Sequence, residues 1–375
     1  MFENTFIINL GEIMKKIGII AEYNPLHSGH IYHFNKIKEE NPNSLVILVL
    51  SGYFTNRGDL SLFNKFEKTN QALLMGVDIV LELPIIYTLE RADLFAYYTT
   101  TFLNYLGVDE IVIGSEENNI ELYNNALNKF YINYDKSKSL KQNTLDCIPF
   151  KPNDLLGFFY YKSIKENNYN IILKTIKRNS SNFNDVTPSN DTFASAKAIR
   201  CNLDLLDTYT PKYVSDYKNN ILDENKLFNY LKYRILSSSK DELKNIFFVD
   251  EGIEAKLKDI YKFSDYNSFI NYLSNKKYSI SRIKRMLVYI LLNVSKMDAD
   301  NCLTQEINYA RILGFNDFGK SYIKTIKKNK NLYTNIKDDI SKVFDIELKT
   351  AKVLDTIFNT NFVLEEQKGP KIKEA

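Results

Sequence analysis

The sequence predicts an α/β fold: a Rossmann-like, doubly wound parallel sheet at residues 14–210, followed by a mainly helical domain at residues 211–375. In the first part, short β-branched runs alternate with helical periodicity, which is the pattern of parallel βαβ units. Near Ser215 these runs stop, and long segments with a 3.6-residue period take over. Residues 1–13 are predicted to be an N-terminal extension, because their acidic residues and the lack of a small-residue cleavage site argue against a secretory signal.

Five apolar runs are expected to be the strands of this sheet. Their short length and their Ile and Val content favour buried strands over buried helices. The runs are residues 17–23 (IGIIAEY), 45–50 (LVILVL), 78–84 (DIVLELP), 110–114 (EIVIG) and 170–176 (NIILKTI).

The helical pattern of the second region is clearest at residues 280–294 (ISRIKRMLVYILLNV). The apolar side chains that share one helix face there are Ile283, Met286, Leu287, Ile290 and Leu291. The boundary between the two regions is expected within residues 210–220.

Composition indicates a soluble globular protein of the cytoplasm. Hydrophobic residues make up 44% of the chain, enough to build cores. Lys plus Arg number 49 and Asp plus Glu 46, so any contact with nucleic acid needs local basic clusters. Cys147, Cys201 and Cys302 are odd in number and widely spaced, which argues against disulfides and thiolate zinc sites. No stretch approaches the ~18 uncharged apolar residues that span a bilayer.

All three histidines lie in one ten-residue stretch, NPLHSGHIYH, as His27, His30 and His33. Zinc binding is one interpretation, although Gly29 between the first two and the lack of a nearby Cys argue against it. A helix that happens to carry polar side chains is another, and it explains His33 better than the other two.

The context of the pair His27 and His30 is more specific, because the first strand leads through them into a helix. In an open parallel sheet this place is the crevice at the carboxyl ends of the strands. A helix N-terminus there offers N–H groups and a positive dipole end to phosphate, and Gly29 allows close approach. Two imidazoles can donate hydrogen bonds to α- and β-phosphate oxygens, each typically worth about 3 to 4 kcal/mol in barrier height.

This order of strand, motif and helix resembles the HxGH nucleotidyltransferase superfamily. The resemblance implies that a nucleophile attacks the α-phosphorus of a nucleoside triphosphate and releases pyrophosphate. It implies catalysis by positioning and charge stabilisation, consistent with the lack of a Ser-His-Asp or Cys-His arrangement and of a GxxxxGK[ST] loop in the sequence.

A longer resemblance narrows the substrate. Residues 51–84 (SGYFTNRGDLSLFNKFEKTNQALLMGVDIVLELP), between AEYNPLHSGHIYH and VIGSE, are similar to the bacterial tRNA(Met) cytidine acetate ligase family. So are KPNDLLGFFY, TIKRNSS, ASAKAIR, SISRIKRML and YARILGFNDFGKSYIKTIK, and the likeness extends from Ile17 to about Lys330. It implies an ATP-dependent ligase that activates acetate as acetyl-adenylate and acetylates N4 of the wobble cytidine of elongator tRNA(Met), forming N4-acetylcytidine.

The same resemblance implies the site residues, with His27 and His30 as catalytic contacts to the phosphates. The implied ATP-binding residues are Ile20, Ala21, Glu22, Tyr23, Asn24, Pro25, Leu26, His27, Ser28, Gly29, His30, Ile31, Tyr32, His33, Gly114, Asn153, Arg178 and Ser195. Mg²⁺ is expected with ATP, because it neutralises the leaving pyrophosphate. No residue set in the sequence indicates where the ion binds.

The outlying residues also have ordinary structural interpretations. Gly114 could turn the chain after a strand, and Arg178 could be a solvated charge. Ser195 could cap a helix or, with Arg200, bind phosphate as Ser and Arg do in the second motif of the superfamily. The neighbouring aspartate, Asp154, could shift the alignment of Asn153 with the family motif.

Lys65 is predicted to be a third catalytic residue. Lys65 and Arg57 follow the second strand, where cations can meet phosphate or the acetate carboxylate, and surface solvation is the alternative. The family usually has Asp-Lys-Trp where this chain has Asn64, Lys65 and Phe66. The change removes a carboxylate and leaves in doubt the proton or cation role that it served.

Two basic clusters are predicted to bind tRNA. The first comprises Arg282, Lys284 and Arg285 on one helix. The second is a later run of lysines, Lys320, Lys324, Lys327, Lys328 and Lys330, with the central three as the main candidates. Solvated helix faces are the alternative, but such clusters suit phosphate contacts that supply affinity for RNA.

Two other functions remain open on the sequence alone. An adenylyltransferase acting on a small phosphorylated cofactor precursor would use the same histidines but would need no helical domain. A nucleotide- and RNA-binding protein without catalysis would explain the Asn64 departure but not the intact His27 and His30.

Overall fold

The computed structural model describes residues 14–133, 135, 143, 150–178, 187–188, 192–250, 252–337 and 341–373. In this part of the chain one sheet has the strand order β5-β4-β1-β2-β3-β6-β7, and β8 pairs with β6. The strands are β1 (Lys16–Ala21), β2 (Leu45–Ser51), β3 (Ile79–Leu83), β4 (Glu110–Ser115), β5 (Ile172–Lys177), β6 (Tyr309–Asn316), β7 (Asn331–Tyr333) and β8 (Lys371–Lys373). The first five are parallel, and they correspond to the five predicted runs. The predicted α/β fold class is therefore confirmed.

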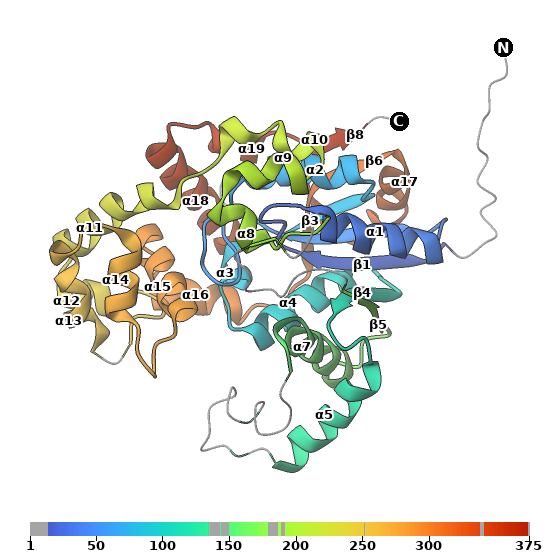
Figure 1. The fold of residues 1–375 in the computed structure, drawn as a ribbon, viewed down its shortest axis with the longest axis horizontal. Coiled ribbons are helices and arrows are strands. Elements are labelled where there is room, and N and C mark those ends of the chain that lie inside the picture. The colour runs from blue at the N-terminus through green and yellow to red at the C-terminus, as the bar shows by residue number, and fades with distance from the viewer. Residues whose placement is uncertain are drawn as a thin grey trace.

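Helices cover both faces of this sheet (Figure 1). On one face Phe34 of α1 fits against Gly76 at the end of α2, and on the other Leu103 of α4 packs against Gly18 of β1. The helices of this region are α1 (Ser28–Glu40), α2 (Lys65–Met75), α3 (Ile85–Thr88), α4 (Ala92–Tyr105), α5 (Ile120–Asn133) and α7 (Pro152–Glu166). Because the covering helices change faces between the neighbouring strands β1 and β4, the carboxyl ends of these strands form the topological switch point.

A group of helices lies beside the carboxyl ends of the strands (Figure 1). It follows α8 (Ala196–Cys201), α9 (Leu206–Tyr209) and α10 (Lys212–Ser215), and we call it the helical lobe. Its members are α11 (Leu227–Ser237), α12 (Lys240–Lys244), α13 (Ile253–Leu257), α14 (Tyr266–Leu273), α15 (Ile280–Leu292) and α16 (Lys296–Leu303). The predicted apolar face of α15 is buried, including Ile283, Met286, Leu287 and Ile290.

The chain then returns to the sheet, which the sequence pattern does not predict. The segment YARILGFN, which the resemblance places in a helical region, forms β6 and pairs antiparallel with β3. Its residues 310–314 are all buried, as in β2, but Arg311 and Gly314 interrupt the apolar run, so β6 lacks the continuous run of Ile, Val and Leu that marks β2 as a strand. The remaining helices are α17 (Asp317–Ile326), α18 (Lys342–Phe358) and α19 (Phe362–Gln367). Strands from both sides of residue 210 build one sheet. The division of the chain into two domains at this residue stays a prediction.

The centre of the sheet is the core that positions the loops above it. All seven residues of β2 are buried. A helix able to cross a membrane is absent from the described part of the chain.

Candidate active site at the carboxyl edge of the sheet

Two histidines form the N-terminal cap of α1. Nδ1 of His27 accepts a hydrogen bond from the main-chain N–H of Gly29 at 3.0 Å. In return, Nδ1 of His30 accepts one from the main-chain N–H of His27 at 3.2 Å. This reciprocal capping box holds the two ring centroids 3.9 Å apart.

These hydrogen bonds determine which nitrogen of each imidazole carries its proton. Since both Nδ1 atoms accept, the proton of each neutral ring is on Nε2. Burial lowers the pKa of His27 to about 3, and the positive charges of Arg178 and Arg200 add to the effect. Burial, His27 and Arg178 also lower the pKa of His30 well below its usual value. Each ring is therefore neutral and offers one N–H, from Nε2, to a ligand.

The third histidine lies on the next turn of the same helix. Burial, together with Arg178, lowers the pKa of His33 to about 4. Its Nε2 is buried without a hydrogen-bond partner among the described residues. A group of three or more His, Cys, Asp or Glu side chains that could hold a metal ion is likewise absent from this part of the chain. The zinc interpretation of the motif therefore finds no support in the geometry.

The rest of the motif turns the chain from strand to helix. Tyr23, two residues after β1, has a positive φ of 44° and is buried, and the edge of its ring meets His30 at a centroid distance of 4.8 Å. Leu26 is fully buried. The Ser28 hydroxyl donates to the carbonyl of Thr192 at 2.8 Å, which ties the start of α1 to the segment before α8.

Two arginines flank the histidine pair from different elements. Arg178 follows β5, and its main-chain N–H donates to the carbonyl of Ser115 at the end of β4. A Cβ on Gly114 would lie 3.3 Å from Cγ of Arg178, so this glycine gives the arginine its space. On the other side, the Arg200 guanidinium of α8 donates to the carbonyl of Asn24 at 2.5 Å. Arg200, which the sequence left less clearly involved, is thus fixed to the motif loop.

Asn153 and its neighbouring aspartate have different surroundings. Both oxygens of the Asp154 carboxylate accept hydrogen bonds inside the protein, from the hydroxyls of Ser115 and Tyr123 and from a main-chain N–H. Asn153 is half-buried and donates to Glu116 at 2.5 Å. Glu116 in turn acts electrostatically on Arg178. Asn153 is therefore linked to Glu116, its role in ATP binding stays a prediction, and Asp154 has a buried structural role.

Ser195 caps α8, as its structural interpretation holds. Its hydroxyl oxygen accepts a hydrogen bond from the N–H of Ala198 at 2.9 Å. Its role in ATP binding stays a prediction.

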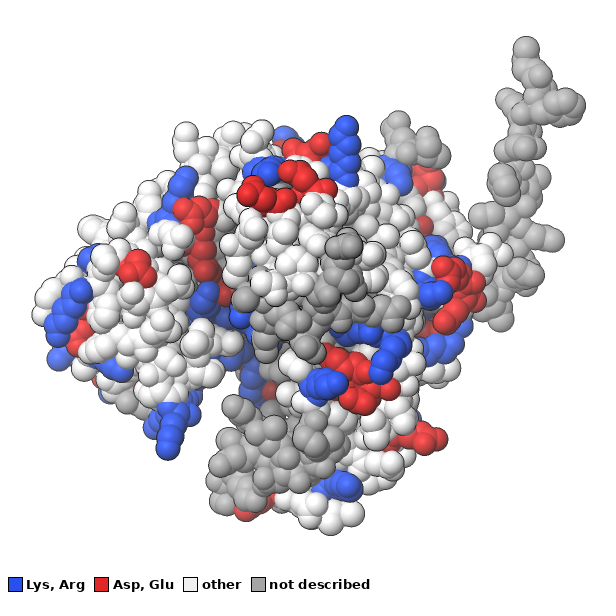
Figure 2. All heavy atoms as spheres, viewed as in Figure 1, with Lys and Arg blue, Asp and Glu red and all other residues white. Residues whose placement is uncertain are grey.

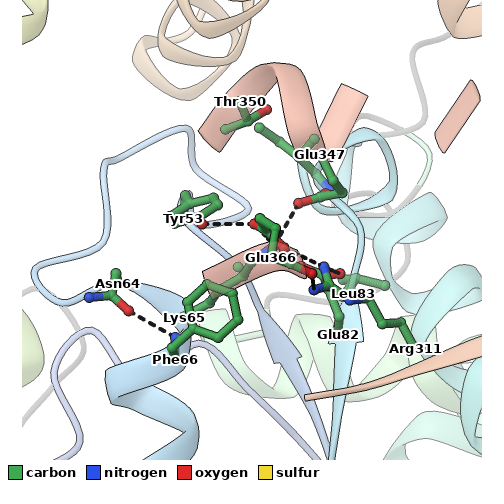
Figure 3. A network of polar contacts seen from close by, with 12 residues as sticks. Tyr53, Asn64, Lys65, Phe66, Glu82, Leu83, Arg311, Glu347, Thr350 and Glu366 are labelled. Atoms are coloured by element: carbon green, nitrogen blue, oxygen red, sulfur yellow. Dashed lines mark hydrogen bonds and ion pairs between the residues drawn. The ribbon is translucent and has the colours of Figure 1, made fainter. Parts of the chain in front are cut away.

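Lys65 does not lie beside the histidines. Its side chain is fully buried, and its ammonium pairs with the carboxylates of Glu82, Glu347 (3.1 Å) and Glu366 (2.6 Å), as Figure 3 shows. Arg311 of β6 pairs with Glu82 at 2.8 Å and Glu366 at 2.6 Å. This buried charge network joins α2 and β3 to β6, α18 and α19. It gives Lys65 a structural environment, and the predicted catalytic role of Lys65 remains untested.

Asn64, which stands where the family usually has aspartate, has a structural role. It is the N-cap of α2, and its side-chain oxygen accepts from the N–H groups of Phe66 at 2.9 Å and Glu67 at 3.1 Å. Asn and Asp are about equally good N-caps. The position therefore has a helix-capping function that asparagine preserves.

Lys68 is a buried cation that the sequence analysis missed. Its ammonium donates to the carbonyls of Glu22 at 3.0 Å and Ser51 at 2.7 Å and to the hydroxyl of Ser61 at 3.0 Å. Burial lowers the pKa of this lysine to about 7. Lys68 thus ties together the carboxyl ends of β1 and β2 under the crevice. In the sequence, only the position of Lys68 one helical turn after Lys65 suggests that the two lysines share a helix face.

The two predicted RNA-binding clusters lie at opposite edges of the sheet. Lys284 and Arg285 face the loops at the carboxyl edge. The lysines Lys324, Lys327 and Lys328 are exposed on and after α17. This helix begins against the main chain of Asp78, which precedes β3, and is therefore at the amino edge (Figure 1).

A doubly wound sheet with a capped histidine pair at its switch point defines a nucleotidyltransferase of the HxGH type. The model of the HIGH nucleotidyl transferase family matches residues 14–369. The tRNA(Met) cytidine acetate ligase of Staphylococcus haemolyticus is 33% identical over 94% of this chain and 100% of its own length. That of Staphylococcus aureus (strain JH9) is 32% identical over 92% and 96%. This chain therefore belongs to the tRNA(Met) cytidine acetate ligase family within the HIGH nucleotidyl transferases.

Solved structures agree with the fold. The apo structure of Thermotoga maritima TmcAL has a TM-score of 0.82 and 25% identity, over 96% of this chain and 100% of that one. The structure of the same enzyme bound with α-thio ATP has a TM-score of 0.79 and 24% identity, with the same coverage.

Proposed function

We propose that this protein is an ATP-dependent ligase that activates acetate as acetyl-adenylate and acetylates N4 of the wobble cytidine of elongator tRNA(Met). The observation that supports it most directly is the His27 and His30 pair, whose hydrogen bonds leave both Nε2–H groups for a ligand. The curated relatives, which are tRNA(Met) cytidine acetate ligases over nearly the whole chain, supply the substrates of the proposal.

In the first half-reaction an acetate oxygen attacks the α-phosphorus of ATP, and the bond to the bridging oxygen breaks as pyrophosphate leaves. The two Nε2–H groups donate to phosphate oxygens as negative charge moves onto the leaving group. Arg178 and Arg200 surround the pair with positive charge. Neutral imidazoles suit this role, because donors fixed in advance need no reorganisation during the reaction.

Magnesium enters as part of the substrate. The described residues include no ready cluster of ligands for it. Mg²⁺ commonly keeps several waters and binds substrate phosphates together with one or two carboxylates. We therefore expect Mg²⁺ to be bound mainly by the phosphates of ATP.

In the second half-reaction N4 of cytidine attacks the acyl carbon of acetyl-adenylate. A carbon–nitrogen bond forms, the bond from the acyl carbon to the phosphate oxygen breaks, AMP leaves, and N4 loses a proton. Because N4 attacks acetyl-adenylate directly, the enzyme needs no covalent intermediate, and AMP departs as a phosphate monoester.

The test uses purified protein, ATP, magnesium, isotopically labelled acetate and unmodified elongator tRNA(Met), with nucleosides analysed by mass spectrometry. Labelled N4-acetylcytidine that depends on ATP and is lost in His30→Ala is the expected result. Acetate-dependent exchange of pyrophosphate into ATP measures the first half-reaction alone. A folded protein that binds ATP but shows neither signal would contradict the proposal and favour an adenylyltransferase for a cofactor precursor.

A further inference from the structure

The loop after β2 is tied to the end of the histidine-motif strand. The main-chain N–H of Asn56 donates to the carboxylate of Glu22 at 2.6 Å. The side-chain amide of Asn56 donates to the carbonyls of Thr88 at 2.9 Å and Glu90 at 2.7 Å, beyond β3. Asn56 therefore links the carboxyl ends of three neighbouring strands, β1, β2 and β3.

The helical lobe docks on this same loop through α15. Gly58 has a φ of +82°, and a Cβ there would lie 2.6 Å from the main-chain nitrogen of Arg285, so a side chain has no room. The Arg285 guanidinium donates to the carbonyl of Glu90, which also accepts from Asn56. The ammonium of Lys284 pairs with Asp59 at 2.6 Å and with Glu224 at 3.0 Å.

These contacts give two residues of the first predicted RNA-binding cluster, Lys284 and Arg285, a structural role. The Lys284 side chain is only 13% exposed and is held between two carboxylates. Arg285 is half-buried against the loop. Both side chains attach the helical lobe to the loops of the crevice. Positive charge that an RNA could contact at this junction must therefore come from neighbouring residues.

Three arginines border the junction at its surface, and we call them the arginine rim: Arg57, Arg91 and Arg282. Arg57 precedes Gly58 and is exposed. Arg91 follows Glu90, and its side chain is 61% exposed and pairs with Asp93 at 2.9 Å. The half-exposed Arg282 lies 4.6 Å over the ring of Tyr278.

The rim lies on the correct side of the molecule for a substrate that must reach the histidines. Figure 2 shows Lys and Arg side chains within the hollow between the helical lobe and the part of the molecule that carries α5 and α7. The lysines of α17 lie at the other edge of the sheet. Because β2 spans seven residues at about 3.3 Å each, the two edges are roughly 20 Å apart.

We propose that the phosphate backbone of the RNA substrate binds along the arginine rim, so that the target base enters the crevice between the helical lobe and the loops after β2 and β3. The inference rests on the proposed function, because it assumes an RNA substrate. Guanidinium groups suit this task, since their planar donors match phosphate oxygens in pairs. Phosphate contacts of this kind position an RNA loop while its unstacked bases are read elsewhere.

The experiment compares two sets of charge-removing variants in the full-length protein. The rim variant is Arg91→Gln with Arg282→Gln. The control is the triple variant Lys324→Gln, Lys327→Gln and Lys328→Gln, which removes more charge from exposed positions. Binding of unmodified elongator tRNA(Met) is measured by fluorescence anisotropy over a range of salt concentrations, and melting temperatures establish that both variants fold.

We expect the rim variant to bind the tRNA about tenfold more weakly and the slope of log K against log salt to fall by about 1.5, since each phosphate contact contributes about 0.7 to 0.9. Adding Arg57→Gln should reduce the slope by nearly one further unit. The triple variant should bind within about twofold of wild type. Acetate-dependent pyrophosphate exchange, which needs no RNA, should be unchanged in the double rim variant.

Unchanged tRNA affinity in the rim variant, or a larger loss in the triple variant, would overturn the proposal. Failure of the proposed function is a separate result: wild-type protein without pyrophosphate exchange or acetylcytidine refutes the ligase chemistry. Weakened tRNA binding by the rim variant would still support the rim in that case.

Discussion

The main-chain N–H of His27 donates to Nδ1 of His30 over 3.2 Å, and this hydrogen bond places the ring proton of His30 on Nε2. The reciprocal bond from Gly29 does the same for His27. Each imidazole therefore uses one nitrogen to cap α1, and in the proposed function the other nitrogen donates to a phosphate of the substrate.

Substitution at His27 can separate the capping of α1 from the donation by Nε2–H. Asn at this position keeps a side-chain oxygen that can accept from Gly29 N–H, but it loses the Nε2–H group. We expect His27→Asn to have a free energy of unfolding within about 0.5 kcal/mol of wild type. We expect its acetate-dependent pyrophosphate exchange to fall by about 10²- to 10³-fold, the usual effect of removing one such donor.

His27→Ala is the matched comparison, because it removes the cap as well. Its unfolding free energy, from urea titration, should be lower by about 1 kcal/mol. If His27→Asn exchanges pyrophosphate at the wild-type rate, the Nε2–H of His27 has no catalytic role.

The histidines should not titrate in the folded protein near their usual pKa. Burial lowers the pKa of His27 to about 3 and that of His33 to about 4. With only three histidines in the chain, their ring signals can be followed by NMR, and they should stay at neutral-imidazole positions between pH 8 and pH 5. Nε2–H tautomers are expected for His27 and His30.

The same shifts predict the direction of acid destabilisation. Below pH 6.5 the unfolded chain binds protons at histidines that the folded protein keeps neutral, so stability is full above pH 6.5 and is lost as pH falls toward 4. Replacing His33 by Gln should reduce this loss in urea titrations at pH 4.5 compared with pH 7. A histidine signal that titrates near pH 6.5 in folded protein would contradict the burial and the neutral state of the histidine that gives that signal.

Lys65 is expected to stabilise the fold through the buried charge network. Lys65→Met leaves the carboxylates of Glu82, Glu347 and Glu366 with Arg311 as their remaining cation in that network. Breaking a buried ion pair in this way typically costs 3 to 5 kcal/mol, so the unfolding free energy should fall by about that amount.

Tyr53→Phe is the control, since it removes one hydrogen bond to Glu366 and keeps every charge. It should cost about 1.5 to 3 kcal/mol, as typical for a hydrogen bond to a charged group. A Lys65→Met protein as stable as wild type but inactive in pyrophosphate exchange would instead support the catalytic role predicted from the sequence.

Asn64 should be replaceable by the residue usual in the family. Asn64→Asp keeps the oxygen that caps α2 and adds negative charge at a helix N-terminus, so its stability should equal or slightly exceed that of wild type. Asn64→Ala should lower the unfolding free energy by about 1 kcal/mol. Equal stability of the Ala and Asp variants would show that capping is not the function of this position.

Local sequence patterns determined much of this protein. Five strands could be predicted because each is a short run rich in Ile and Val that lies between segments with the 3.6-residue period of helices. The histidine pair could be placed at the switch point because its strand, loop and helix are contiguous in the chain. Capping by Ser195 could also be inferred, since a cap depends on residues within one turn.

Only the tertiary structure decided which charged residues face substrate and which are buried. The ammonium of Lys65 pairs with Glu347, 282 positions later, and Lys284 pairs with Asp59, 225 positions earlier. Strand β6 carries Arg311 and Gly314 among its buried residues, and its pairing with β3 and β8 appears only in the completed sheet. Charge and apolarity can be read from a sequence, but burial and ion pairing are set by partners that only folding brings within a few ångströms.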